Sequence, residues 1–431
     1  MSMETGAGRW IVCQVGAREH YAIATELHRR GTLDGLLADV WAAPGSPWKL
    51  VSRVSKVLGA ESTAQAISGR YRSGGIHGVS PGIARWARWQ MREARQGRDQ
   101  CFSSWAASEI EKQMRSAATQ RVNRSAGSII FSYSYAAADI GRVAKRLGAT
   151  FVLGQIDGGR KEMELVRAIG RKYGLPVEAE WRDAHYWARW REECDLADLI
   201  IVNSNWSRSL LQQEDIDVSK CRIVPLAYEP SSAVAPKNYP EVFTTARPLR
   251  VLFLGQLTAR KGVMELLAAM DELRAAPIML RLVGPPQAGI ERHLTGRPNV
   301  KWDGICPRSR VRDHYRWADV FVLPTHSDGF AITQLEAQEY GLPLITSPFC
   351  GHVVEDRLTG LRLETVTARD IAGALLWAEC SPVGLRRMSE EALRSVQRYS
   401  PRAVVDQLCD AVASLGTPLK ARALSRAPSL I

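Results

Sequence analysis

The sequence has no hydrophobic run long enough to cross a membrane and no pair of cysteines in a C-x-x-C spacing. Its longest apolar stretches, such as VFVLP at 320–324, fall far short of the ~20 residues that span a bilayer. Near the start, Glu4 and Arg9 precede no long apolar stretch, so we expect no signal peptide. Any membrane contact is therefore expected to be peripheral.

Cysteines are also too scattered to form a metal site. The eight of them are Cys13, Cys101, Cys194, Cys221, Cys306, Cys350, Cys380 and Cys409. Their spacing fits no zinc cluster, and several lie in apolar runs, where a cysteine packs as a small core residue. We expect no zinc cluster and a reduced protein in the cytoplasm. Association with the inner face of the membrane stays open.

Acidic residues are scarce in one block of the chain. The 431 residues include 57 Lys and Arg against 45 Asp and Glu, a net charge of +12. Residues 51–150 hold 16 basic and 6 acidic residues (+10), which leaves 41 and 39 (+2) elsewhere. A basic surface in one region favours a membrane, nucleic acid or an acidic ligand as partner. Because no recognised nucleic-acid module accompanies it, we do not expect nucleic-acid binding.

Short apolar runs alternate with helical patterns along most of the chain, for example at 10–16, 150–156 and 250–256. This alternation indicates an α/β fold built from parallel sheets. A proline-rich polar stretch between Tyr228 and Arg250 is interpreted as a linker. We therefore predict two Rossmann-like, doubly wound domains facing across a cleft, with ligands at the carboxyl ends of the strands.

The predicted boundaries are 1–235 for the first, acceptor-binding domain and 245–400 for the second, donor-binding domain. Residues 401–431 should form a helix and a basic tail that could cross back to the first domain. A helical, Trp- and Arg-rich insertion is expected at about 42–127.

One segment of the insertion, IARWARWQMREARQGR at 83–98, combines tryptophans with arginines on a single helix. Two interpretations stay open. The helix could lie on a membrane, with arginines at lipid phosphates and indoles at the headgroups. Alternatively, its tryptophans pack on the first domain and its arginines are solvated.

The stretch at 319–348 contains the most informative chemistry. A strand ends at Pro324, a loop carries Asp328-Gly329-Phe330, and a helix is expected from near Ile332. Backbone N–H groups at such a helix start suit phosphate. Asp328 and Glu336 lie eight positions apart and can both point into one cleft, where carboxylates accept hydrogen bonds from sugar hydroxyls.

This stretch resembles the retaining glycosyltransferases of family 4, in the glycogen synthase superfamily, which have the GT-B fold. Their signature is E-G-F-x-x-x-x-L-E-A, and residues 328–337 read D-G-F-A-I-T-Q-L-E-A. The resemblance implies that Asp328 contacts the donor sugar and that Glu336 binds the nucleotide ribose. Asp328 departs from the usual glutamate by one methylene.

A second motif, VLFLGQLTARKGV at 251–263, resembles the strand–G-R-L-x-x-x-K-G–helix loop of the same family. There an arginine and a lysine neutralise the donor diphosphate, in the role that a metal ion has elsewhere. Lys261 matches the lysine, whereas Gln256 stands in place of the arginine and Arg260 offers the second charge. The resemblance thus implies a nucleotide-diphosphate-sugar donor and no cofactor or metal.

The resemblance implies a donor site made of Gly255, Gln256, Arg260, Lys261, Gly284, Ile305, Asp328, Gly329, Phe330, Ala331, Ile332 and Glu336. Base contacts are expected from the backbone near Gly304 and Ile305. The candidate catalytic residues are Lys261, Arg260, Asp328 and Asp157.

On the acceptor side, the candidates are Gly16, His20 and Asp157. Gly16 follows the first strand, where the family has a glycine-containing loop. His20 stands where it would cap a helix start. Asp157 follows a strand and precedes Gly158-Gly159, a position that favours the cleft.

The leading interpretation is a retaining, hexosyltransferase-like enzyme acting on an acceptor hydroxyl of a glycan, glycolipid or small molecule. The basic first domain favours an anionic or lipid-linked acceptor. A sugar-nucleotide epimerase or a phosphorylase on the same fold stays open. So does a non-catalytic binding scaffold, which Gln256 and Asp328 would favour.

Overall fold

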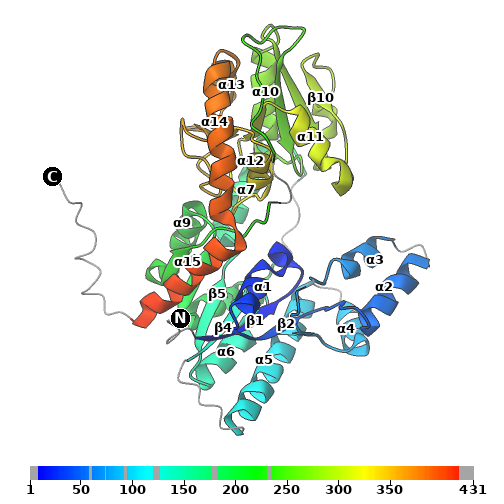
Figure 1. Cartoon of the computed structure of the whole chain (residues 1–431), viewed down its shortest axis with the longest axis vertical. Coiled ribbons are helices and arrows are strands. Elements are labelled where there is room, and N and C mark those ends of the chain that lie inside the picture. Colours follow the sequence, from blue (N-terminus) through cyan, green and yellow to red (C-terminus); the bar gives the residue numbers. More distant parts are fainter. Residues whose placement is uncertain are drawn as a thin grey trace, which may run out of the picture.

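The computed structural model describes residues 8–57, 61–72, 74–91, 95–119, 127–176, 182–230 and 234–416. Two parallel sheets, each covered by helices, stand one above the other along the long axis of the molecule (Figure 1). The predicted α/β fold with two doubly wound domains is confirmed.

The first sheet has the strand order β3-β2-β1-β4-β5-β6-β7, and its paired strands are parallel. The strands are β1 (Arg9–Gln14), β2 (Leu33–Ala38), β3 (Gly78–Val79), β4 (Ser128–Tyr133), β5 (Thr150–Gly154), β6 (Leu199–Val202) and β7 (Cys221–Ile223). The helices are α1 (Ala22–Arg29), α6 (Ala138–Arg146), α7 (Gly159–Lys172), α8 (Ala184–Leu196) and α9 (Asn205–Gln213). The sheet order reverses between β1 and β4, which places the loops after these strands at a topological switch point.

The second sheet has the order β10-β9-β8-β11-β12-β13, again with parallel pairing. The strands are β8 (Leu249–Leu254), β9 (Ile278–Val283), β10 (Val300–Trp302), β11 (Val320–Leu323), β12 (Leu344–Thr346) and β13 (Gly360–Arg362). The helices are α10 (Val263–Glu272), α11 (Val311–Trp317), α12 (Thr333–Glu339), α13 (Ala368–Glu379) and α14 (Pro382–Ser395).

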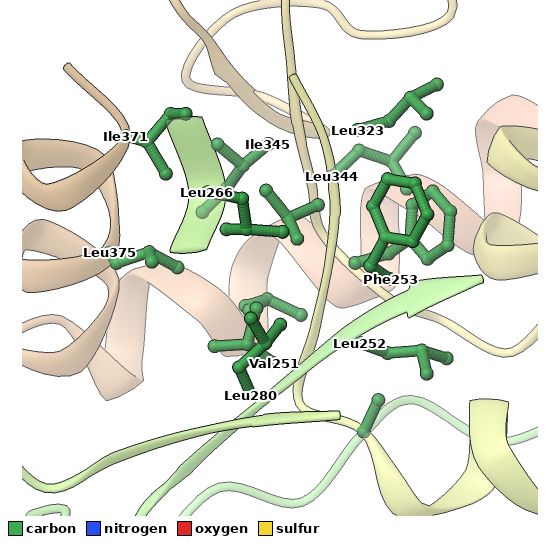
Figure 2. Packing of buried hydrophobic residues seen from close by; sticks show 14 of the residues in the cluster. Val251, Leu252, Phe253, Leu266, Leu280, Leu323, Leu344, Ile345, Ile371 and Leu375 are labelled. Carbon is green, nitrogen blue, oxygen red and sulfur yellow. The ribbon is translucent and has the colours of Figure 1, made fainter. Parts of the chain in front are cut away.

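The core of the second domain explains why its strands are apolar throughout. Val251, Leu252 and Phe253 follow one another in β8 and are all completely buried, because helices cover both faces of the sheet. Figure 2 shows them packed among Leu266, Leu280, Leu344 and Leu375, which come from neighbouring strands and from α10 and α13. Each such buried side chain contributes roughly 1.5–3 kcal/mol, which holds the loops at the strand ends in place.

Helices form most of the insertion in the first domain. They are α2 (Pro47–Val57), α3 (Glu61–Ser68), α4 (Ile83–Gln90) and α5 (Arg95–Thr119). Trp89 is buried against Trp105, and the Trp86 ring lies 5.2 Å from that of Trp48. These contacts support the interpretation in which the tryptophans of α4 pack on the first domain, since Trp89 is buried and Trp86 is half-buried.

The last described helix, α15 (Pro401–Ala413), returns to the first domain and packs beside α1 (Figure 1). Arg30 forms a salt bridge of 2.8 Å with Asp406, and Val404 and Leu408 join the core beneath the first sheet. The basic tail expected after this helix lies outside the described residues. Within the described part of the chain, no helix is long and apolar enough to cross a membrane.

Candidate functional site

A cavity of about 860 Å³ lies between the two domains. It is lined from the first domain by segments that follow β5 and β6, and from the second by the loops after β8, β9 and β11. Parallel sheets leave polar backbone groups at this edge, so ligands bind there. Among the residues predicted from the sequence, the lining includes Asp157, Gln256, Arg260, Asp328 and Gly329.

The loop after β8 holds the basic pair in a fixed turn. The hydroxyl of Thr258 accepts a hydrogen bond from the backbone N–H of Lys261 at 3.2 Å. Gly262 has φ +71°, and a Cβ at this position would lie 1.9 Å from the carbonyl oxygen of Pro324. Only glycine therefore allows this loop to meet the loop after β11.

Asp328, on the loop after β11, faces this basic pair. Its carboxylate forms a salt bridge with Lys261 and lies 4.0 Å from Nη1 of Arg260, which also donates to the carbonyl of Ser327. Burial raises the pKa of Asp328, but the two positive charges outweigh it and lower the pKa below its ordinary value. Asp328 is thus an ionised acceptor that shares one charge cluster with Lys261 and Arg260.

The residues after Asp328 offer backbone donors. Ala331 has φ +59°, and Oδ1 of Asp328 accepts from the N–H of Phe330 at 3.3 Å. Within the described residues, no hydrogen bond uses the N–H of Gly329, Ala331 or Ile332. The side chain of Phe330 is buried against Gly351 and Tyr399, so Phe330 can contribute only its backbone to a ligand.

Glu336 lies in the first turn of α12 and is half-buried. The hydroxyl of Tyr315 donates to its Oε2 at 2.7 Å, and the Tyr315 ring stacks on Tyr340. This phenol fixes the carboxylate, and no side chain of the described residues donates to Oε1. Neither Glu336 nor Lys261 is part of the lining of the 860 Å³ cavity, although Lys261 contacts Asp328, which is.

Glycines bring the carboxyl ends of β8, β9 and β10 close together. Gly255 and Gly284 have φ +145° and +138°, and a Cβ on Gly284 would lie 1.9 Å from the carbonyl oxygen of Gly255. The N–H of Gly284 donates to the carbonyl of Gly304 at 2.8 Å. The next residue, Ile305, is 74% exposed and lines a separate hollow of about 350 Å³.

On the first-domain side, Asp157 reaches the cavity with both carboxylate oxygens engaged. Oδ1 accepts from the N–H of Gly159 at 3.0 Å and Oδ2 from the hydroxyl of Tyr186 at 2.7 Å. The guanidinium of Arg182, which also lines the cavity, lies 3.8 Å from Oδ2. These contacts hold the carboxylate in one orientation.

Gly16 and His20 lie apart from this cavity lining. The N–H of Gly16 donates to Asp39 at 2.9 Å, which ties the loop after β1 to the end of β2. His20 makes no capping hydrogen bond, contrary to the prediction, because its backbone is left-handed at φ +48°. Its ring lies 3.2 Å from Nη2 of Arg308 in the second domain, and desolvation together with the charges of Arg308 and Arg72 lowers its pKa.

Comparison with known proteins decides the family of the second domain. Residues 248–378 match the family described as Glycosyl transferases group 1, and this range contains the loops that carry Arg260, Lys261, Asp328 and Glu336. The second domain is a group 1 glycosyltransferase domain.

The curated relatives of this chain align over part of their length. The D-inositol 3-phosphate glycosyltransferase of Segniliparus rotundus is 29% identical over 189 residues, which cover 41% of each chain. That of Saccharomonospora viridis is 35% identical over 98 residues, which cover 22% of this chain and 23% of the relative. The chain thus spans less than half the length of these relatives.

Solved structures extend the likeness of fold to both domains. HepE of Anabaena in complex with UDP has a TM-score of 0.58 at 13% identity, with 94% of this chain and 100% of that chain covered. Sucrose-phosphate synthase from Thermosynechococcus elongatus has a TM-score of 0.59 at 16% identity, with 94% and 99% covered. At this identity the match establishes the fold, and the two-domain GT-B architecture is confirmed.

Contacts between the glycosyltransferase domain and the first domain involve residues that the sequence analysis missed. Oγ of Ser327 accepts from the indole N–H of Trp206 at 2.8 Å and donates to Glu162 at 2.5 Å. Glu265 is buried in α10, accepts from Tyr173 of α7, and lies 2.9 Å from Nε2 of His326. Ser327 and His326 adjoin Asp328, and this adjacency was the only signal in the sequence that could have drawn attention to them.

Proposed function

We propose that this protein is a retaining glycosyltransferase that moves a sugar from a nucleotide-diphosphate-sugar donor to an acceptor hydroxyl. The observation that carries the proposal is the cluster of Arg260, Lys261 and Asp328 at the mouths of two adjacent strands, beside the interdomain cavity. The two positive side chains can bind a diphosphate, and the carboxylate beside them can accept hydrogen bonds from the attached sugar. The similarity to the D-inositol 3-phosphate glycosyltransferases supports it.

The donor diphosphate would lie against Arg260 and Lys261. Their charges stabilise the negative charge that grows on the leaving diphosphate, so these side chains take the role of a metal ion. The free N–H groups of Gly329, Ala331 and Ile332 add neutral donors on the same side. Gln256, which lines the cavity, contributes an amide where the related motif has a guanidinium.

The sugar, ribose and base of the donor would be bound by other residues of the second domain. Asp328 would accept hydrogen bonds from sugar hydroxyls, and Glu336 from the ribose hydroxyls. The close-packed glycine backbones of Gly255 and Gly284, with the exposed segment at Ile305, would flank the base.

In the transfer step, the bond between the anomeric carbon and the phosphate oxygen breaks, and a bond from that carbon to the acceptor oxygen forms on the same face. The acceptor proton passes to the departing phosphate oxygen, so that atoms and charge balance. Both carboxylate oxygens of Asp157 already accept hydrogen bonds. We assign it to positioning the acceptor together with Arg182, whose charge favours an anionic acceptor.

A donor screen tests this proposal. Purified protein is incubated with UDP-, GDP- and ADP-sugars, with and without EDTA, while nucleotide release and the anomeric configuration of the product are followed by NMR. We expect release from one donor class, an unchanged rate in EDTA, and retention at the anomeric carbon. Absence of turnover together with no thermal shift by any nucleotide would contradict the proposal, and an inverted product would contradict its retaining step.

A further inference from the structure

Helix α2 carries three aliphatic side chains on its solvent side. Leu50, Val54 and Val57 are 64%, 47% and 86% exposed, respectively. Their spacing of four and three residues places them on one face of the helix. Most surface helices turn such a stripe toward the core. In α2 the apolar stripe is instead exposed to solvent, which is typical of a binding surface.

The opposite face of α2 is anchored to the protein. Trp48 and Ser52 are buried, and the indole N–H of Trp48 donates to Ser80 at 3.0 Å. Oγ of Ser52 donates to the carbonyl of Ala64 in α3 at 3.0 Å. Because these contacts fix the rotation of the helix, the apolar stripe cannot turn inward. Figure 1 shows α2 and α3 projecting from the side of the first domain.

Positive charge flanks the apolar stripe. Lys49, Arg53 and Lys56 lie along one side of α2. Arg85 and Arg88 are exposed on α4, which meets α2 through Trp86 and Trp48, on the face opposite the stripe. None of these five takes part in an ion pair within the described residues. Residues 42–91 hold 7 basic residues and 1 acidic residue, Glu61, a net charge of +6. Two of these basic residues, Arg70 and Arg72, are paired with Asp39 and Glu229, which leaves five unpaired.

We propose that α2 docks on an anionic lipid surface. Leu50, Val54 and Val57 would enter the boundary between headgroups and acyl chains, while the flanking basic side chains meet lipid phosphates. This combination of exposed apolar side chains and unpaired cations is complementary to an anionic bilayer. A second copy of this chain fits less well, since a two-fold interface through this face would set its lysines and arginines against those of the partner.

This surface differs from the one that the sequence suggested. The tryptophans of α4 pack within the protein, and the apolar contribution comes from aliphatic residues of a different helix. The proposal does not depend on sugar transfer, because its test measures binding alone.

Vesicle flotation with the full chain tests the proposal. Vesicles of phosphatidylcholine, alone or mixed with phosphatidylglycerol, are floated with the protein at low salt and again at about 0.5 M salt, where charges are screened beyond about 4 Å. We expect the wild type to float only with the anionic vesicles and to be released by salt. Failure to float with them at low salt would overturn the proposal.

Two triple variants assign the binding to α2. Leu50→Ser with Val54→Ser and Val57→Ser should lower the partition coefficient at least about tenfold. Lys49→Gln with Arg53→Gln and Lys56→Gln should lower it on the order of a hundredfold. All six side chains point outward, so circular dichroism should be unchanged.

Matched controls come from the second domain and from α15. Val242→Ser with Leu376→Ser and Val383→Ser removes three other exposed apolar side chains. Arg369→Gln with Arg387→Gln and Arg402→Gln removes three other exposed charges. Both controls should float like the wild type, and an equal loss in them would overturn the assignment to α2. Sedimentation of the wild type and of the α2 apolar variant tests self-association. A wild-type dimer that this variant dissociates, together with unchanged flotation of the variant, would overturn the lipid-docking proposal in favour of a dimer interface.

Discussion

Lys261 and Asp328 form a salt bridge that joins the loop after β8 to the loop after β11. Gly262 and Pro324 bring these loops into direct contact, so the pairing is built into the backbone. A diphosphate would compete with Asp328 for the Lys261 charge. Its binding would release the carboxylate toward the hydroxyls of the attached sugar, which couples recognition of the two halves of the donor.

Lys261→Ala should lower donor turnover by about a hundredfold or more, because it removes a charge that stabilises the leaving diphosphate. Steady-state kinetics with the donor found in the screen measure the loss. Lys112→Ala, on the exposed side of α5, is the matched control and should leave turnover unchanged. Wild-type kinetics in Lys261→Ala would remove this residue from the site.

Glu336→Gln should raise the KM for the donor about tenfold, because hydrogen bonds to a charged acceptor are stronger than those to an amide. The increase in KM should be smaller for a donor with 2′-deoxyribose, because this sugar lacks one of the hydroxyls that would donate to Glu336. Tyr315→Phe should raise KM by a smaller factor, since Tyr315 only orients the carboxylate.

Tyr399→Phe, which removes a long hydrogen bond to His352, serves as the control for the Tyr315 substitution. Equal effects of Glu336→Gln on the ribose and deoxyribose donors would argue against a contact with the ribose.

Gly262→Ala should destabilise the protein by at least about 2 kcal/mol, because alanine is strained at positive φ and its Cβ would overlap the Pro324 carbonyl. Gly373 in α13 has open space around it, so Gly373→Ala should be neutral or stabilising by up to about 1 kcal/mol. Thermal unfolding of both variants checks the pair. A wild-type Tm in Gly262→Ala would show that the loop after β11 can move away.

The buried carboxyl of Glu193 should make the stability of the protein depend on pH. Burial raises its pKa to about 7, although the N–H groups of Tyr135 and Ala137 donate to the carboxylate. Since the folded state favours the protonated form, the stabilisation is complete below the unfolded pKa and is lost as pH rises through 7. Between about pH 5 and about pH 8 the wild type should lose about 2–3 kcal/mol relative to Glu193→Gln.

Urea unfolding of the wild type and Glu193→Gln across this pH range measures the difference. A constant difference would mean that Glu193 is ionised throughout. Glu192→Gln, on the neighbouring and more exposed residue, controls for the loss of one negative charge on α8.

The charged cluster of the second domain could be predicted because its residues fall in two short sequence motifs. Arg260 and Lys261 share one loop, and Asp328 and Glu336 lie eight positions apart, so strand-loop-helix patterns place them without further information. The acceptor half could not be predicted in the same way. Tyr186 and Arg182 reach Asp157 from another element, and no local pattern marks such contacts.

The sequence by itself determined the alternation of buried strands and helices, the two sheets, and the loops that carry the charged donor residues. These features follow from local hydrophobic patterning and from glycines at tight turns. Only the tertiary structure decided which side chains face solvent. It buried Trp89 and packed the half-buried Trp86 against Trp48. It left Leu50, Val54 and Val57 exposed, because the packing of Trp48 and Ser52 sets the rotation of α2. It also brought Ser327 to Trp206 and Glu162, contacts between residues more than a hundred positions apart.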